Sequence, residues 1–229
     1  MAQQGANLKS IVAPSKLDPS TKGAALTELK GRPLWVAAST HPGEEEQVLD
    51  AHTRLLAHHP NLCLILVPRH PERGEDVASL IKSAGLSFTQ RSQGGTLDGD
   101  AQVYLADTMG ETDLWYALSP IVFLGGSFSD VGGHTPFEPA AAHSAILHGP
   151  NYANFAEAYA AFLLQEASVE VKDAAALAAE ITDLLTHPSR AAQLAARARP
   201  LAQDGAQILA QLSDQLFSLI TNADSQRHG

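Results

Sequence analysis

Residues 34–58 read LWVAASTHPGEEEQVLDAHTRLLAH and decide the fold. Residues 34–38 form a continuous apolar run, which is typical of a parallel strand covered on both faces. A short polar turn follows, and residues 44–58 then have the length and apolar spacing of a helix. A strand that leads through a short turn into a helix is the repeating unit of an open parallel sheet.

The same alternation continues along the chain. Further strands are predicted at residues 62–67, 87–89, 102–106, 121–124, 145–147 and 168–171. Helices are predicted at residues 72–84, 111–118, 136–143 and 154–166, and then at about 174–186, 189–199 and 205–220. This order predicts an α/β fold, a doubly wound Rossmann-like parallel sheet with C-terminal helices. Residues 1–30 have few apolar anchors and are typical of a linker, so one domain is predicted for residues 31–229.

The composition excludes several classes of protein. Hydrophobic residues make up 45% of the chain and charged residues 17%, so a buried core is expected. The net charge of −10 argues against nucleic-acid binding, because neutralising phosphates requires clustered basic side chains. The apolar runs are far shorter than the roughly 20 residues of a membrane helix. The single cysteine, Cys63, lies inside an apolar run and is expected in the core, which fits a reducing cytoplasm.

The turn after the first strand contains short polar side chains. Ligands of an open parallel sheet bind beyond the carboxyl ends of its strands, which is where this turn lies. Pro42 and the three following acids are explained as the start of a helix. Ser39, Thr40 and His41 are not explained in that way. His41 can therefore contact a ligand or simply cap the helix, and the sequence leaves both open.

The turn after the second strand presents an arginine between two prolines. Pro68 and Pro71 restrict the backbone around Arg69 and His70. The guanidinium of an arginine is a planar fork of donors that suits a phosphate or a carboxylate. The alternative is a surface ion pair between Arg69 and an acid of the next helix, Glu72 or Glu75.

The third turn, residues 107–111, reads DTMGE. Asp107 or Thr108 is expected to cap the following helix. Gly110 allows a ligand to approach the backbone closely, so the backbone of Met109 is expected to matter more than its sulfur.

The fourth turn contains two glycine pairs, in GGS at 125–127 and in GGHTPFEP at 132–139. Glycine pairs at the end of a strand fit a backbone held close to a phosphate. Thr135, Pro136 and Glu138 also match a capping box. On residue pattern alone, Glu138 is better explained by this cap than by a contact with ribose hydroxyls.

Several familiar motifs do not occur in the sequence. A P-loop, a G-x-G-x-x-G string, an H-E-x-x-H zinc motif and a G-x-S-x-G nucleophile elbow are all absent. Asp98 and Asp100 match the D-x-D pattern of metal-dependent sugar transferases, but their Gly-rich surroundings favour a surface turn. No metal or cofactor is therefore expected.

Six strings in order make the sequence similar to the Kdo (3-deoxy-D-manno-octulosonic acid) transferases, which have a two-domain GT-B glycosyltransferase fold. The strings are ASTHPGEE at 38–45, PRHPER at 68–73, DTMGE at 107–111, GGS at 125–127, GGH at 132–134 and GPNYANF at 149–155. The similarity runs from about residue 34 to 155 and more loosely through the terminal helices. It departs from the family at Thr135, where the family usually has Asn.

The resemblance implies a site for the donor nucleotide sugar, CMP-Kdo. The residues implied to contact CMP are Pro68, Arg69, Met109, Gly110, Glu111, Thr135, Pro136, Phe137 and Glu138. Residues with possible contacts to the donor are Ser39, Thr40, His41, Gly126, Ser127, His134 and Asn154. The resemblance thus gives Glu138 a ligand contact in addition to a cap.

The resemblance also implies an inverting enzyme of lipopolysaccharide biosynthesis in Gram-negative bacteria, which transfers Kdo to a lipid A precursor at the cytoplasmic face of the inner membrane. The family's general base, a Glu, belongs to an N-terminal acceptor domain. No catalytic residue is therefore expected in this chain, which is predicted to bind CMP-Kdo but to transfer nothing alone. The alternatives are half of another GT-B enzyme that uses a UDP-sugar, and a stand-alone nucleotide-sensing module.

Overall fold

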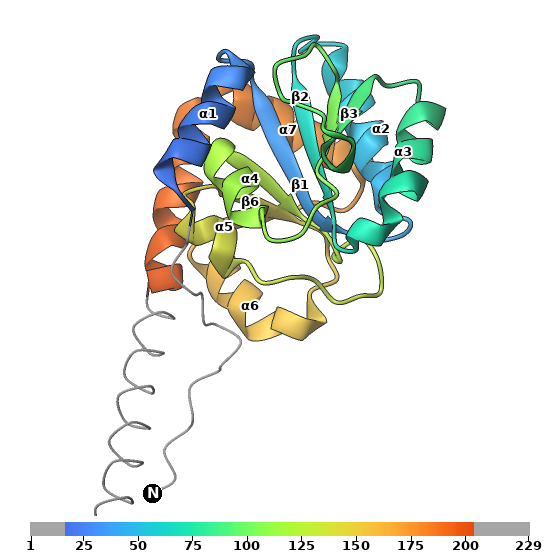
Figure 1. Ribbon diagram of the computed structural model, residues 1–229. Helices are drawn as coiled ribbons and strands as arrows, with labels where there is room; N and C mark the ends of the chain where they lie inside the picture. The colour runs from blue at the N-terminus through green and yellow to red at the C-terminus, as the bar shows by residue number, and fades with distance from the viewer. Residues whose placement is uncertain (1–16, 204–229) are drawn as a thin grey trace, which may run out of the picture.

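The computed structural model describes residues 17–203, which form a parallel sheet between two layers of helices (Figure 1). The seven strands are ordered β3-β4-β2-β1-β5-β6-β7, and every neighbouring pair is parallel. The strands are β1 (Leu34–Thr40), β2 (Cys63–Pro68), β3 (Phe88–Gln90), β4 (Val103–Leu105), β5 (Ile121–Leu124), β6 (Ala145–His148) and β7 (Ser168–Glu170). The sequence-based prediction of a Rossmann-like fold is confirmed.

The α-helices are α1 (Pro19–Leu29), α2 (Glu45–Leu56), α3 (Gly74–Ser83), α4 (Thr112–Leu118), α5 (Phe137–Ala141), α6 (Ala156–Leu164) and α7 (Ala174–Thr186), and residues 188–203 are also helical. Helices α2 to α6 lie between successive strands, whereas α1 precedes β1 and α7 follows β7. The short 3-10 helices are η2 (Pro71–Arg73), η3 (Arg91–Gln93) and η4 (Ala153–Phe155). No helix in this described part of the chain is long and apolar enough to cross a membrane.

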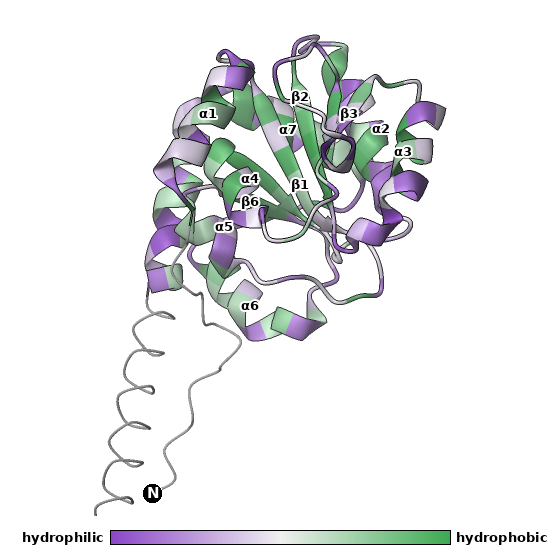
Figure 2. Ribbon diagram, viewed as in Figure 1, coloured by the Kyte–Doolittle hydropathy of each residue, from purple (hydrophilic) through white to green (hydrophobic). Residues whose placement is uncertain are grey.

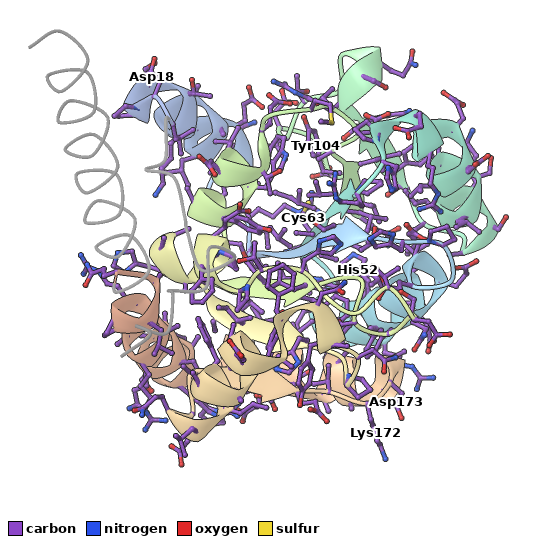
Figure 3. The ribbon with its side chains drawn as sticks, turned by 90° about the horizontal axis from the view of Figure 1, so that it is seen from below. Asp18, His52, Cys63, Tyr104, Lys172 and Asp173 are labelled. Atoms are coloured by element: carbon purple, nitrogen blue, oxygen red, sulfur yellow. The ribbon has the colours of Figure 1, made fainter. Side chains whose placement is uncertain are left out.

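Each face of the sheet has its own hydrophobic core. Trp35 packs with α2, α3 and α7, whereas its neighbour Val36 packs with α1, α4, α5 and α6. Adjacent residues of a strand point to opposite faces, so a continuous apolar strand supplies both cores. Figure 2 shows the result as hydrophobic residues along the strands and hydrophilic residues on the outer sides of the helices. Cys63 is buried in the second core, as predicted, and Figure 3 shows it in the interior.

The first helix differs from the sequence-based expectation. Residues 19–29 fall in the segment whose composition is typical of a linker, yet they form α1, which packs against α4. Ala25 and Leu29 are its buried side chains, and Asp18 caps it by accepting a hydrogen bond from the amide of Ser20 at 2.9 Å. The helix expected at about 205–220 lies outside the described residues.

The strand order reverses around β1, and this reversal places the site. The chain moves from β1 to one side of the sheet through β2, and later returns to the other side through β5. The loops that leave β1 and β5 therefore separate to opposite faces, which opens a crevice at the carboxyl ends of these strands.

Candidate nucleotide-binding site

A cavity of about 270 Å³ lies at the carboxyl ends of β1 and β2. The four turns that the sequence singled out all contribute to its wall. The lining residues are Ser39, Val67, Pro68, Arg69, Pro71, Thr108, Met109, Gly110, Thr112, Tyr116, His134, Thr135 and Glu138.

The turn after β1 holds a non-glycine residue in the left-handed region. Ser39 has a φ of 58°, and the pairing of β1 with β2 shifts register there. Gly125 packs so closely that a Cβ on it would lie 2.5 Å from the Ser39 carbonyl oxygen. Tyr116, a buried residue of α4, lines the cavity together with Ser39. Strained backbone of this kind is found preferentially at functional sites.

A buried carboxylate connects this turn to the glycine-rich loop after β5. Glu44 is fully buried, and its carboxylate accepts hydrogen bonds from the backbone amides of His41 at 3.0 Å, Gly126 at 2.6 Å and Phe128 at 2.8 Å. The position of the acid at the start of α2 was expected from the helix dipole. Its role in holding two loops together was not visible in the sequence.

Arg69 lines the cavity with an exposed side chain. Its amide donates to the Thr40 carbonyl at 3.0 Å, which holds the turn against β1. The alternative interpretation, an ion pair with Glu72 or Glu75, is not what the structure has, since Arg69 has no salt bridge to any acid within residues 17–203. The guanidinium is therefore available to an anionic ligand.

The third turn contributes Met109 and Gly110 but not its acid. The Met109 side chain is 74% exposed at the rim of the cavity, and Gly110 has a φ of 80°. Glu111 instead pairs with Arg91 at 2.7 Å and accepts a hydrogen bond from the Thr108 hydroxyl. These bonds lower the pKa of Glu111, with Arg91 as the main cause.

The predicted cap of the helix after this turn is wrong. The residue that precedes α4 is Glu111, and no side chain caps the helix. Asp107 instead accepts hydrogen bonds from the amide of Ser92 at 2.9 Å and the side chain of Gln90 at 2.8 Å, which joins the ends of β3 and β4. An acid that follows a strand can accept hydrogen bonds from the end of the neighbouring strand instead of from the first amides of the next helix.

The predicted capping box is wrong as well. Helix α5 begins at Phe137, no side-chain cap bond is made, and the Thr135 hydroxyl accepts only a long 3.4 Å bond from the Phe137 amide. Glu138 faces the cavity instead of folding back on the backbone. Its pKa is raised by desolvation first and then by the charge of Asp113, although the side chain keeps contact with solvent.

The glycine-rich loop places His134 in the wall of the cavity. The His134 carbonyl accepts a hydrogen bond from the buried Tyr159 hydroxyl at 2.9 Å, and the amide of Gly133 donates to the Gly126 carbonyl at 2.7 Å. The rings of His134 and His41 point at each other through their Nε2 atoms, which are 2.8 Å apart, and their planes differ by only 8°. His41 itself does not line the cavity and reaches it only through His134.

The other predicted residues lie beside the cavity or in the core. Thr40 and Ser127 are fully buried, Pro136 and Phe137 are buried, and Asn154 donates to the Val131 carbonyl at 2.7 Å. Tyr116 is the main lining residue that sequence reasoning missed. It belongs to the helical run DLWYAL, which has the pattern of a core helix.

Asp98 and Asp100 lie in a different hollow, of about 690 Å³, with Glu28, Arg32 and Gln102. Within residues 17–203, no three His, Cys, Asp or Glu side chains are grouped so that they can hold a metal ion.

Comparisons with known proteins identify relatives of this domain. Over 144 residues the chain is 44% identical to the 3-deoxy-D-manno-octulosonic acid transferase of Haemophilus influenzae, which covers 63% of this chain and 34% of that protein. Over 218 residues it is 34% identical to the Bordetella pertussis enzyme of the same name, covering 90% of this chain and 51% of that protein. The chain thus spans about a third to a half of the length of these relatives. No family model matches the sequence.

One solved structure is similar over nearly its whole length. The C-terminal CMP-Kdo binding domain of WaaA from Acinetobacter baumannii is 35% identical, with a TM-score of 0.77 over 80% of this chain and 97% of that domain. The sheet, the terminal helices and the cavity at the strand ends define the C-terminal Rossmann-like domain of a GT-B glycosyltransferase. The two enzymes have the same name, and the solved domain is named for binding CMP-Kdo. This chain is 34–44% identical to the three of them. The chain belongs to the Kdo transferase family.

Proposed function

We propose that this chain binds CMP-Kdo by its cytidylate in the cavity at the ends of β1 and β2. The observation that carries the proposal is the convergence of Arg69, the Met109–Gly110 turn and Glu138 on that cavity. These are residues that the resemblance assigns to CMP. The similar domain of WaaA is described as a CMP-Kdo binding domain, which supports the same ligand.

The cavity suits the nucleotide better than the whole nucleotide sugar. Pockets for small molecules usually enclose about 300–1,000 Å³, so about 270 Å³ is just below that range. We propose that the cytidylate occupies it and that the Kdo group lies towards the acceptor domain of the full-length enzyme. Arg69 then stabilises the negative charge on the phosphate as CMP leaves.

The transfer itself belongs to the full-length enzyme in this proposal. Its acceptor domain supplies the carboxylate that deprotonates the acceptor hydroxyl, and that hydroxyl attacks the anomeric carbon with inversion as CMP departs. The acceptor is a lipid A precursor at the cytoplasmic face of the inner membrane. In this proposal the isolated chain binds the donor without transferring Kdo.

Calorimetric titration of the 229-residue chain with CMP, UMP and GMP tests the ligand. We expect CMP to bind most tightly. Equal binding of all three nucleotides, or none, would contradict the proposal, and a preference for UMP would indicate a UDP-sugar enzyme instead. Added chelator should leave CMP binding unchanged, whereas a large loss would restore a metal role for Asp98 and Asp100.

A further inference from the structure

His41 and His134 come from different loops and meet ring to ring. His41 follows β1, and His134 lies in the glycine-rich loop after β5. Their Nε2 atoms are 2.8 Å apart, and the planes of the rings differ by only 8°. A hydrogen bond between two imidazole nitrogens contains one proton, so one ring donates while the other accepts. The tautomer of one ring is therefore tied to that of the other.

The surroundings of the pair favour its neutral form. The pKa of His134 is lowered to about 4, chiefly by desolvation and then by the positive charges near it. The pKa of His41 is also lowered, again chiefly by desolvation. The charged and titratable groups that face the two rings are Arg69 and His70 from the turn after β2, Glu44 and Glu45 from the start of α2, and Tyr159 from α6.

Neither nearby carboxylate hydrogen-bonds to the ring of His41 or His134. The Glu44 carboxylate is occupied by three backbone amides. The Glu45 carboxylate is buried and forms a two-pronged ion pair with Arg73, with N···O distances of 2.7 and 3.3 Å. The charges of Glu44 and Glu45 raise the pKa of His41 only from a distance and are outweighed by desolvation, so an anion that enters from the cavity can supply a direct partner for a proton on the pair.

We propose that His41 and His134 act as a proton-sharing pair that takes up one proton from solvent when a phosphate group binds beside Arg69. His134 contacts the phosphate, because it lines the cavity together with Arg69. His41 is a positioning residue that holds the ring of His134 and shares its proton. The inference rests on the proposed function, since it names the part of that site which takes the phosphate.

The physical reason is a change in the balance of charges. A bound phosphate offsets both the desolvation and the neighbouring positive charges that keep the pair neutral. In the neutral pair only the accepting ring has an N–H on Nδ1. Once protonated, the pair keeps the shared proton between its Nε2 atoms and both rings have an Nδ1–H, so His134 is a donor in either arrangement. A hydrogen bond between charged partners is about twice as strong as one between neutral groups. Phosphate binding and proton uptake therefore support each other.

Histidine-selective NMR on the 229-residue chain tests the pair directly. The midpoint at which the two rings titrate is measured in chloride, inorganic phosphate, cytidine and CMP at matched ionic strength. We expect phosphate and CMP to raise the midpoint by about one pH unit or more, and cytidine to leave it unchanged. A midpoint that neither phosphate nor CMP moves would overturn the inference.

Variants separate proton uptake from simple packing. His41→Gln keeps an amide donor for His134 but cannot take up a proton, whereas His41→Ala loses both. The readout is the slope of CMP affinity against pH in the two proteins, not their affinity at one pH. Between about pH 6 and pH 4.5 the wild-type affinity should gain on that of His41→Gln as the pH falls, by at most about tenfold per pH unit, the limit for one linked proton. Equal pH dependence in the two proteins would count against the pair.

The two proposals fail in different ways. If CMP does not bind while inorganic phosphate still raises the midpoint, the proposed function is wrong and the proton-sharing pair stands. If CMP binds in preference to UMP and GMP but the midpoint does not move, the nucleotide assignment stands and the pair is wrong.

Discussion

Arg69 is a positive side chain in the wall of the cavity that lacks a carboxylate partner among residues 17–203. Arg69→Ala is expected to weaken CMP binding by about 1–3 kcal/mol, the range for a lost hydrogen bond to a charged group. Calorimetry measures the change. The matched control is Arg54→Ala on α2, which removes an equal charge from an exposed pair with Asp50 and should leave CMP affinity unchanged.

Ser39 adopts a φ of 58°, a conformation that costs L-residues with a Cβ roughly 1–2 kcal/mol. In regular structure alanine is usually more stable than glycine, and we expect the reverse at residue 39. The free energy of unfolding, measured in urea, should be about 1 kcal/mol higher for Ser39→Gly than for Ser39→Ala. Both variants lose the hydroxyl, but only glycine relieves the strain in the backbone. At Ala179, exposed in the middle of α7, alanine should be more stable than glycine by about 0.5–1 kcal/mol. The usual order at residue 39 would mean that its backbone is not strained.

At the scale of elements, the carboxylate of Glu44 joins the β1–α2 turn to the loop after β5. Glu44→Gln replaces one accepting oxygen with an amide that donates, so at least one buried amide loses its partner. We expect a loss of about 2–4 kcal/mol in the free energy of unfolding, measured in urea. Amide exchange at Gly126 and Phe128 should also become faster. Glu46→Gln, an exposed change on the same helix, should have little effect. An equal loss of stability in Glu46→Gln would argue against a specific role for Glu44 in linking the two loops.

Elements with strong patterns were predictable from sequence. Strand β5 and helix α7 have the predicted bounds. A short continuous apolar run between turns indicated the strand, and a long stretch with helical spacing of apolar residues indicated the helix. Helix α1 was missed because only two of its side chains, Ala25 and Leu29, are buried. An amphipathic period that short does not stand out from a linker.

The convergence of the four turns was predictable, but the direction of single side chains was not. Parallel strands bring their carboxyl ends to one edge, so turns far apart in sequence meet whatever their residues are. Whether Glu138 caps its helix or faces the cavity depends on where α5 begins, and a shift of one residue decides it. Tyr116 was hidden because an apolar helical run does not reveal which residue reaches the cavity.

At the scale of the whole molecule, His52 links distant parts of the fold through buried hydrogen bonds (Figure 3). Its Nδ1 accepts from the Trp35 indole at 3.1 Å, and its Nε2 donates to the Gln102 carbonyl at 2.9 Å. Both bonds require a neutral ring with the proton on Nε2. Desolvation is the main cause that lowers the pKa of His52 to about 4.

This histidine should make the fold sensitive to acid. In the unfolded chain a histidine has a pKa of about 6.5, so between about pH 6.5 and pH 4 the unfolded state binds more protons and stability falls as pH falls. The contribution lost by about pH 5 is about 2 kcal/mol for one such group. Urea unfolding between about pH 7.5 and 5 should show a flatter pH dependence for His52→Gln than for the wild type. His58→Gln, at an exposed site, should retain the wild-type slope, and a wild-type slope in His52→Gln would show that the ring is protonated in the folded protein.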